Sequence, residues 1–103
     1  EGFCYINQFY SDYNPEAHIV RLGPEIWSQT HGQIDYFVHG IGTGGCVQGV
    51  GTFLKAKKPA AKIIAVEPSE SRIHIGEPKG KHAILGIGAG LRSAFLGEPD
   101  GAF

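Results

Sequence analysis

The sequence has almost no net charge and no long apolar run. Nine Lys and Arg residues stand against ten Asp and Glu residues, so the formal net charge is −1. A chain without a basic excess lacks the patch that favours nucleic acid. No apolar stretch reaches the roughly 20 residues of a transmembrane helix, and no secretory signal pattern is present. We therefore expect no nucleic-acid or membrane partner and a cytoplasmic location, with an organelle as the open alternative.

Cysteine is also scarce. Cys4 and Cys46 are the two cysteines, and their positions do not match the spacing of a metal site. Two thiols in such a chain favour the reduced state, although a disulfide between them stays open. The five histidines lack metal spacing as well, so we expect no metal site.

Glycine, in contrast, is abundant: 16 of the 103 residues, about twice the usual share. The densest cluster is residues 40–46 (GIGTGGC). It follows an apolar run at 34–38 and precedes residues 47–57, whose apolar side chains recur at helical spacing. A strand that leads through a glycine turn into a helix leaves backbone N–H groups free at the helix start, where the helix dipole favours an anion. This pattern predicts a phosphate-bearing cofactor site.

Further elements are predicted around that loop. A short strand at 3–6 and a turn at 11–15 precede a helix that begins at Gly23-Pro24 and ends at His31-Gly32. A buried strand at 34–38, the helix at 47–57 and a strand at 62–66 follow. Gly49 and Gly51 suggest that another backbone packs closely against the helix at 47–57.

The order strand, helix, strand predicts a βαβ unit over about 34–67 with parallel strands. Parallel sheets are covered on both faces, so the helix at 24–31 is expected on the face opposite the crossover helix. Two strands still lack neighbours. We therefore expect residues 1–103 to form one segment of a larger α/β domain, with a parallel, helix-flanked sheet.

The glycine loop admits two other interpretations. Gly40, Gly42 and Gly45 satisfy the G-x-G-x-x-G pattern of dinucleotide sites, and Glu67 lies near the place of the acid that binds the ribose. A purely structural glycine turn without a ligand is the other alternative.

Four motifs in order resemble the cysteine synthase (O-acetylserine sulfhydrylase) and cystathionine β-synthase family. They are GPEIW at 23–27, GIGTGG at 40–45, VEP at 66–68 and GIGAG at 86–90, and the likeness runs over about residues 7–90. These are fold-type-II pyridoxal-phosphate enzymes of the tryptophan-synthase-β type. The resemblance favours pyridoxal 5′-phosphate over a dinucleotide as the cofactor.

The resemblance also assigns residues. The cofactor phosphate would be bound by Gly42, Thr43, Gly44, Gly45 and Cys46. The active-site cleft would be lined by Gly86, Ile87 and Gly88. Cys46 stands where the family has threonine, and a thiol is a weaker donor than a hydroxyl. His39 stands where the family has a small residue; we interpret it as a strand end, with a contact to the phosphate as the alternative.

By resemblance, the complete protein would be a homodimer that replaces the acetoxy group of O-acetylserine, a small amino-acid substrate, with sulfide to give cysteine. Cyanide or homocysteine stays open as the acceptor. This chemistry needs a lysine that forms a Schiff base with the cofactor, and no lysine here matches that motif. We therefore assign no catalytic residue and expect the segment alone to be inactive. A non-catalytic regulatory relative and a dinucleotide-binding module are the alternative functions.

Overall fold

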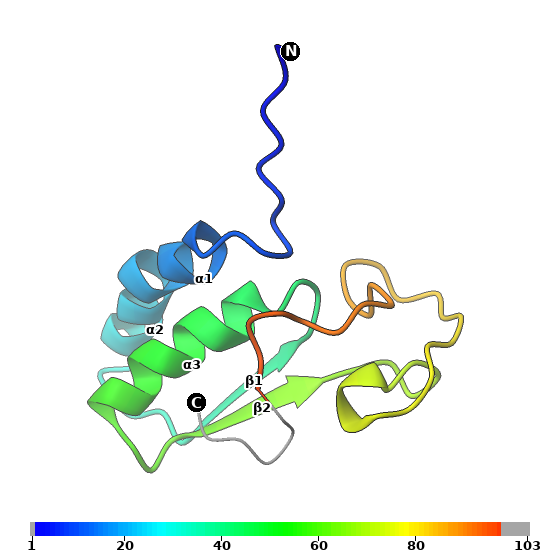
Figure 1. Ribbon diagram of the computed structural model, residues 1–103. Helices are drawn as coiled ribbons and strands as arrows, with labels where there is room; N and C mark the ends of the chain where they lie inside the picture. Colours follow the sequence, from blue (N-terminus) through cyan, green and yellow to red (C-terminus); the bar gives the residue numbers. More distant parts are fainter. Residues whose placement is uncertain (1, 98–103) are drawn as a thin grey trace.

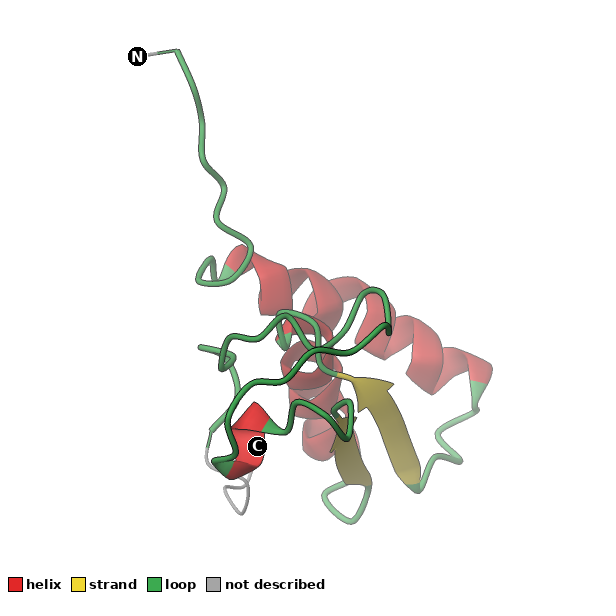
Figure 2. Cartoon of the chain, turned by 90° about the vertical axis from the view of Figure 1, so that its right-hand side faces the viewer, coloured by secondary structure: helices red, strands yellow, loops and turns green. Residues whose placement is uncertain are grey.

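The computed structural model describes residues 2–97, and Figure 1 shows their arrangement. Residues 2–6 extend away from the rest of the chain in both views (Figure 1, Figure 2). In chain order the elements are α1 (Tyr13–Ala17), the π-helical η1 (His18–Leu22), α2 (Gly23–Gln29), β1 (Tyr36–Gly40), α3 (Gly45–Lys57), β2 (Lys62–Val66) and the 3₁₀ turn η2 (Ile73–Ile75). No helix among these described residues has the length and apolarity needed to cross a bilayer.

The two strands form a parallel sheet joined through α3. Tyr36 lies opposite Lys62 and Gly40 opposite Val66. The predicted α/β class with parallel strands is thus confirmed, and β2 has the predicted bounds. β1 begins and ends two residues later than predicted, because pairing with β2 sets its limits: the N–H of Ile41 still donates to the Val66 carbonyl at 2.9 Å.

The helical region before the sheet begins earlier than the sequence predicted. The turn predicted at 11–15 is wrong, since α1 begins at Tyr13 and the chain stays helical through Gln29. Pro24 therefore lies inside a helical run rather than at its start. Pro24 has no N–H to donate to the preceding turn. Just before it, the helix takes the wider π-helical form of η1, in which the Gly23 N–H donates to the His18 carbonyl five residues earlier.

The strand predicted at 3–6 is also wrong. The sheet has two strands among the described residues, β1 and β2. Phe3 and Tyr5 are almost fully exposed. A β-prone stretch stays irregular where no strand edge is within reach, because a strand needs a partner for its backbone groups.

α3 is the centre of the core. Its apolar face, with Val47, Val50 and Leu54, is fully buried. α1, η1 and α2 contact α3 on the side away from the strands (Figure 1). A Cβ at Gly49 would collide with the carbonyl oxygen of Pro15, so the predicted close approach of a backbone at this glycine is confirmed.

The other face of the sheet has no cover among the described residues. The predicted placement of the helix at 24–31 on that face is wrong, because α2 contacts α3 and neither strand. Tyr36, Val38, Ile64 and Val66 are 41% to 58% exposed, so the predicted burial of the first strand is wrong as well. A parallel sheet with an open apolar face is typical of a segment whose covering elements lie elsewhere in a larger protein.

Candidate cofactor phosphate site

The glycine loop joins the carboxyl end of β1 to the amino end of α3. Gly44 caps the 13-residue helix with φ at 90°, in the left-handed region that favours glycine. A Cβ at Gly44 would also collide with Ser93. This position therefore requires glycine for its backbone conformation and for the space around it.

Most backbone donors of the loop are unused. Within residues 2–97, the N–H groups of Gly42, Thr43, Gly44 and Cys46 make no hydrogen bond. Gly45 donates to Oγ1 of Thr43 at 3.2 Å. Unused N–H groups at the amino end of a helix carry partial positive charge, so the loop is suited to an anion.

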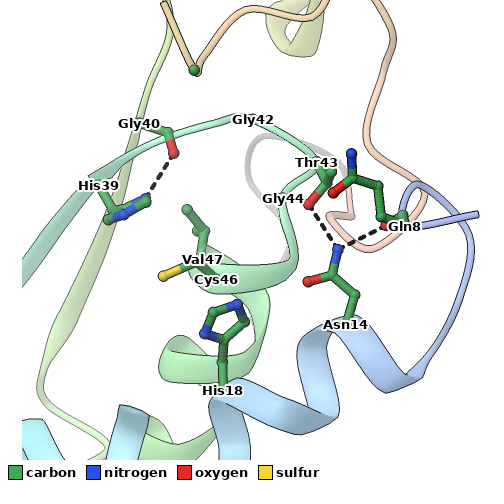
Figure 3. Close-up of a pocket in the computed structure, with 11 residues that line it drawn as sticks. Gln8, Asn14, His18, His39, Gly40, Gly42, Thr43, Gly44, Cys46 and Val47 are labelled. Carbon is green, nitrogen blue, oxygen red and sulfur yellow. Dashed lines mark hydrogen bonds between the residues drawn. The ribbon is translucent and has the colours of Figure 1, made fainter.

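The Thr43 hydroxyl is oriented by two donors. Its oxygen accepts hydrogen bonds from Nδ2 of Asn14 at 2.9 Å and from the N–H of Gly45 at 3.2 Å. A hydroxyl has two acceptor sites and one proton, so both acceptor sites are filled and the proton is left to donate. Asn14 is held in turn by the Gln8 carbonyl, at 2.7 Å from its Nδ2 (Figure 3).

A pocket of about 260 Å³ opens beside the loop. Figure 3 shows the side chains around it. Eleven residues line it: Gln8, Asn14, His18, His39, Gly40, Gly42, Thr43, Gly44, Cys46, Val47 and Gly86. None of these is acidic, so no carboxylate repels an anion there. Four of the five predicted phosphate-binding residues line this pocket. Gly45 does not, and a Cβ at this position would collide with the amide of Asn14.

The second glycine cluster lies against the first. The Gly88 N–H donates to the Ile41 carbonyl at 2.9 Å, and a Cβ on Gly42 would lie 2.8 Å from the Gly86 oxygen. A Cβ on Gly40 would lie 2.6 Å from Cγ2 of Ile87. The structure thus brings together the phosphate-binding and cleft-lining residues that the sequence predicted, with Gly86 at the pocket itself.

His82 holds the second cluster in place. Its Nδ1 accepts a hydrogen bond from the Ile84 N–H at 3.2 Å, so Nε2 carries the proton and donates to the Gly88 carbonyl at 2.7 Å. No sequence pattern pointed to His82, Asn14 or Ser93 as residues of the site. Each acts through a contact that only the folded chain reveals.

His39 and Cys46 are the two residues near the loop that differ from the residue types expected from the resemblance. His39 Nδ1 donates to the neighbouring Gly40 carbonyl at 2.7 Å, as a residue at a strand end would. Cys46 is half-buried and Cys4 is exposed, and the two are not joined in a disulfide. Burial raises the pKa of the Cys46 thiol, which keeps it neutral beside the loop. Among the described residues, no group of three His, Cys, Asp or Glu side chains is placed to hold a metal.

Glu67 is occupied within the protein. One carboxylate oxygen lies 2.5 Å from Nδ1 of His74, and both oxygens lie 3.2 Å from the His74 backbone N–H. The side chain is 9% exposed. It is therefore not presented to a ribose, which weighs against the dinucleotide interpretation.

Comparison with known proteins decides the family. The family model described as "Pyridoxal-phosphate dependent enzyme" matches residues 1–96. The chain belongs to the pyridoxal-phosphate dependent enzymes. Their cofactor, pyridoxal 5′-phosphate, is the one predicted from the sequence.

Similar members of this family include cysteine synthases. Cysteine synthase 3 of Caenorhabditis elegans is 46% identical over 86 residues, covering 84% of this chain and 26% of the relative. Cysteine synthase A of Escherichia coli (strain K12) is 42% identical over 104 residues, covering 93% of this chain and 32% of the relative. The chain therefore spans about a third or less of the curated relatives it matches.

Solved structures of the family have the same fold over this segment. The crystal structure of cysteine synthase from Entamoeba histolytica matches with a TM-score of 0.84 and 46% identity, over 88% of this chain and 27% of that one. The O-acetylserine dependent cystathionine β-synthase of Helicobacter pylori matches with a TM-score of 0.79 and 40% identity, over 87% of this chain and 29% of that one. The small parallel sheet is thus a portion of a fold-type-II architecture, as predicted.

Proposed function

We propose that this chain is the phosphate-binding segment of a cysteine synthase. The observation that carries the proposal is that the N–H groups of Gly42, Thr43, Gly44 and Cys46 make no hydrogen bond within residues 2–97, while these four residues line a pocket without carboxylates. A phosphate dianion needs several donors at short range. The Thr43 hydroxyl adds one more, since its acceptor sites are already filled.

The residues present fit pyridoxal 5′-phosphate. Its single phosphate ester matches one cradle of donors at the amino end of α3, whereas a dinucleotide also needs an acid for its ribose. Gly86 lines the pocket with backbone rather than a side chain, and a Cβ there would meet no other atom within 4 Å, which leaves room for a flat ring. When bound, the cofactor supplies the electron sink for chemistry at the α-carbon of an amino acid. The residues of this chain hold and orient its phosphate end.

The reaction proposed for the complete protein is β-replacement on O-acetylserine with sulfide, giving cysteine and acetate. The proposal is supported by relatives named cysteine synthase and by a structural neighbour described as O-acetylserine dependent. The lysine that reacts with the cofactor is expected outside residues 1–103, so this segment alone is expected to be inactive. We further propose a cytoplasmic homodimer, which size-exclusion chromatography with light scattering and localisation of a tagged protein would test.

Isothermal titration of the complete protein with pyridoxal 5′-phosphate, and separately with NAD, tests the cofactor. Saturable binding of pyridoxal 5′-phosphate with no heat from NAD is the expected result. The reverse result would contradict the proposal. Product analysis with O-acetylserine and either sulfide, cyanide or homocysteine then tests the reaction, and cysteine formed from sulfide is the expected product. Cofactor binding without any turnover would favour a non-catalytic regulatory relative instead.

A further inference from the structure

A buried chain of hydrogen bonds runs from the end of β2 to the glycine loop. The Glu67 carboxylate contacts Nδ1 of His74 at 2.5 Å. Nε2 of that ring lies 2.9 Å from the backbone N of Ser93, and the Ser93 hydroxyl lies 2.6 Å from the Thr43 carbonyl. The side chains of Glu67 and His74 are 9% and 13% exposed, and Ser93 is 7% exposed. Water therefore has little access to these groups, and their polar atoms depend on one another.

The direction of each bond fixes the protons on His74. The Ser93 N–H can only donate, so Nε2 of His74 accepts and carries no proton. Nδ1 must then carry the ring proton, which it donates to Glu67. Glu67 also accepts from the backbone N–H of His74. The ring is thereby held as one neutral tautomer by an acceptor on one side and a donor on the other.

The last bond of the chain acts on the loop. The Ser93 hydroxyl oxygen accepts from the Phe95 N–H at 3.2 Å, which leaves its proton for the Thr43 carbonyl. In a trans peptide the carbonyl and the following N–H point in opposite directions. Holding the Thr43 carbonyl toward Ser93 therefore directs the Gly44 N–H away from Ser93. Gly44 has φ at 90° and no Cβ, so its backbone alone does little to resist a flip of this peptide.

We propose that Ser93, His74 and Glu67 are positioning residues that orient the Thr43–Gly44 peptide for a bound phosphate. This inference rests on the proposed function of the loop. Ser93 holds the carbonyl, His74 holds the backbone of Ser93, and Glu67 selects the tautomer of His74 that can do so. None of the three touches the phosphate, and each acts through the next.

The test compares variants of the complete protein by the Kd for pyridoxal 5′-phosphate and for inorganic phosphate. Ser93→Ala removes the donor to the Thr43 carbonyl and is expected to weaken both ligands about five-fold. Ser93→Thr keeps the hydroxyl and is expected to restore most of the affinity. Ser69→Ala is the matched control, because among the described residues the Ser69 hydroxyl bonds only the neighbouring Glu70 and its loss should leave both Kd values unchanged.

Two further measurements separate positioning from general destabilisation. Nitrogen NMR of the wild-type His74 ring should show the proton on Nδ1 and none on Nε2. His74→Leu should weaken binding of pyridoxal 5′-phosphate. His74→Gln should retain more affinity, because the glutamine carbonyl can still accept from the Ser93 N–H. The double variant His74→Leu with Ser93→Ala should lose little more affinity than either single variant.

Three results would overturn the positioning role without affecting the proposed function. They are a proton on Nε2 of His74, additive losses of affinity in the double variant, and an unchanged Kd in Ser93→Ala while the wild type binds tightly. A wild-type protein that binds neither ligand would instead refute the proposed function, and the positioning role with it.

Discussion

Asn14 and Thr43 are joined by a hydrogen bond across 29 residues of sequence, with Nδ2 of Asn14 2.9 Å from Oγ1 of Thr43. This bond connects the first helix to the glycine loop. Because Asn14 donates, the Thr43 hydroxyl is free to donate in turn. The amide thus determines which way the loop's only hydroxyl proton faces, although Asn14 need not touch the ligand.

Asn14→Asp in the complete protein should reverse that arrangement. The new carboxylate accepts hydrogen bonds only, so it would take the Thr43 proton and add negative charge beside the pocket. We expect a greater loss of pyridoxal 5′-phosphate affinity than in Asn14→Ala, by about ten-fold or more. Equilibrium dialysis measures both variants. Equal losses would show that only the packing of Asn14 matters.

Thr43→Val should remove the side-chain donor while keeping the shape of the residue. A hydrogen bond to a charged group contributes about 1.5–3 kcal/mol, so the Kd for pyridoxal 5′-phosphate should rise at least ten-fold. Thr52→Val in α3 is the control, since Thr52 is exposed and, among the described residues, its hydroxyl bonds only Gln48. Thr43→Ser should stay close to wild type. Unchanged occupancy in Thr43→Val would remove the hydroxyl from the site.

The Cys46 thiol should react slowly with alkylating reagents. Burial raises its pKa above the ordinary thiol value, so at a given pH the reactive thiolate is scarcer than in an exposed cysteine. At about pH 8 the alkylation rate should lie below that of the same cysteine in the urea-unfolded chain, and it should keep rising to a higher pH. Bound pyridoxal 5′-phosphate should slow it further. Mass spectrometry of the peptide that contains Cys46 measures these rates, and no protection by the cofactor would count against the placement of the thiol beside the ligand.

Cys46→Thr tests the substitution at the end of the loop. Threonine brings a stronger hydrogen-bond donor to the position next to the unused N–H groups. The affinity for pyridoxal 5′-phosphate should rise or stay the same in a fluorescence titration. A clear fall would mean that the thiol makes a favourable contact that a hydroxyl cannot replace.

The sequence predicted the features that arise from local patterns. The apolar spacing of Val47, Val50 and Leu54 predicted α3, and the β-branched run at 62–66 predicted β2 with its observed bounds. The glycines at 42 and 44 predicted the loop between β1 and α3. Each of these patterns lies within a few residues of the element that it predicts, so it can be recognised without knowledge of the fold.

The features that depend on distant contacts were not predictable. Asn14 and Pro15 indicated a turn, yet α1 forms because its backbone packs against Gly49 of α3, and proline is tolerated in a first helical turn. Tyr36 and Val38 indicated a buried strand, but nothing among the described residues covers that face. The hydrogen bond from Ser93 to the Thr43 carbonyl joins residues 50 positions apart, and no local sequence pattern predicts it.

Amide NMR of the complete, isotope-labelled protein during addition of pyridoxal 5′-phosphate tests whether the loop amides bind the phosphate. We expect large downfield shifts of the amide protons of Gly42, Thr43, Gly44 and Cys46, with the amide of Thr52 almost unchanged. Saturated cofactor binding without movement of those four amides would contradict this expectation.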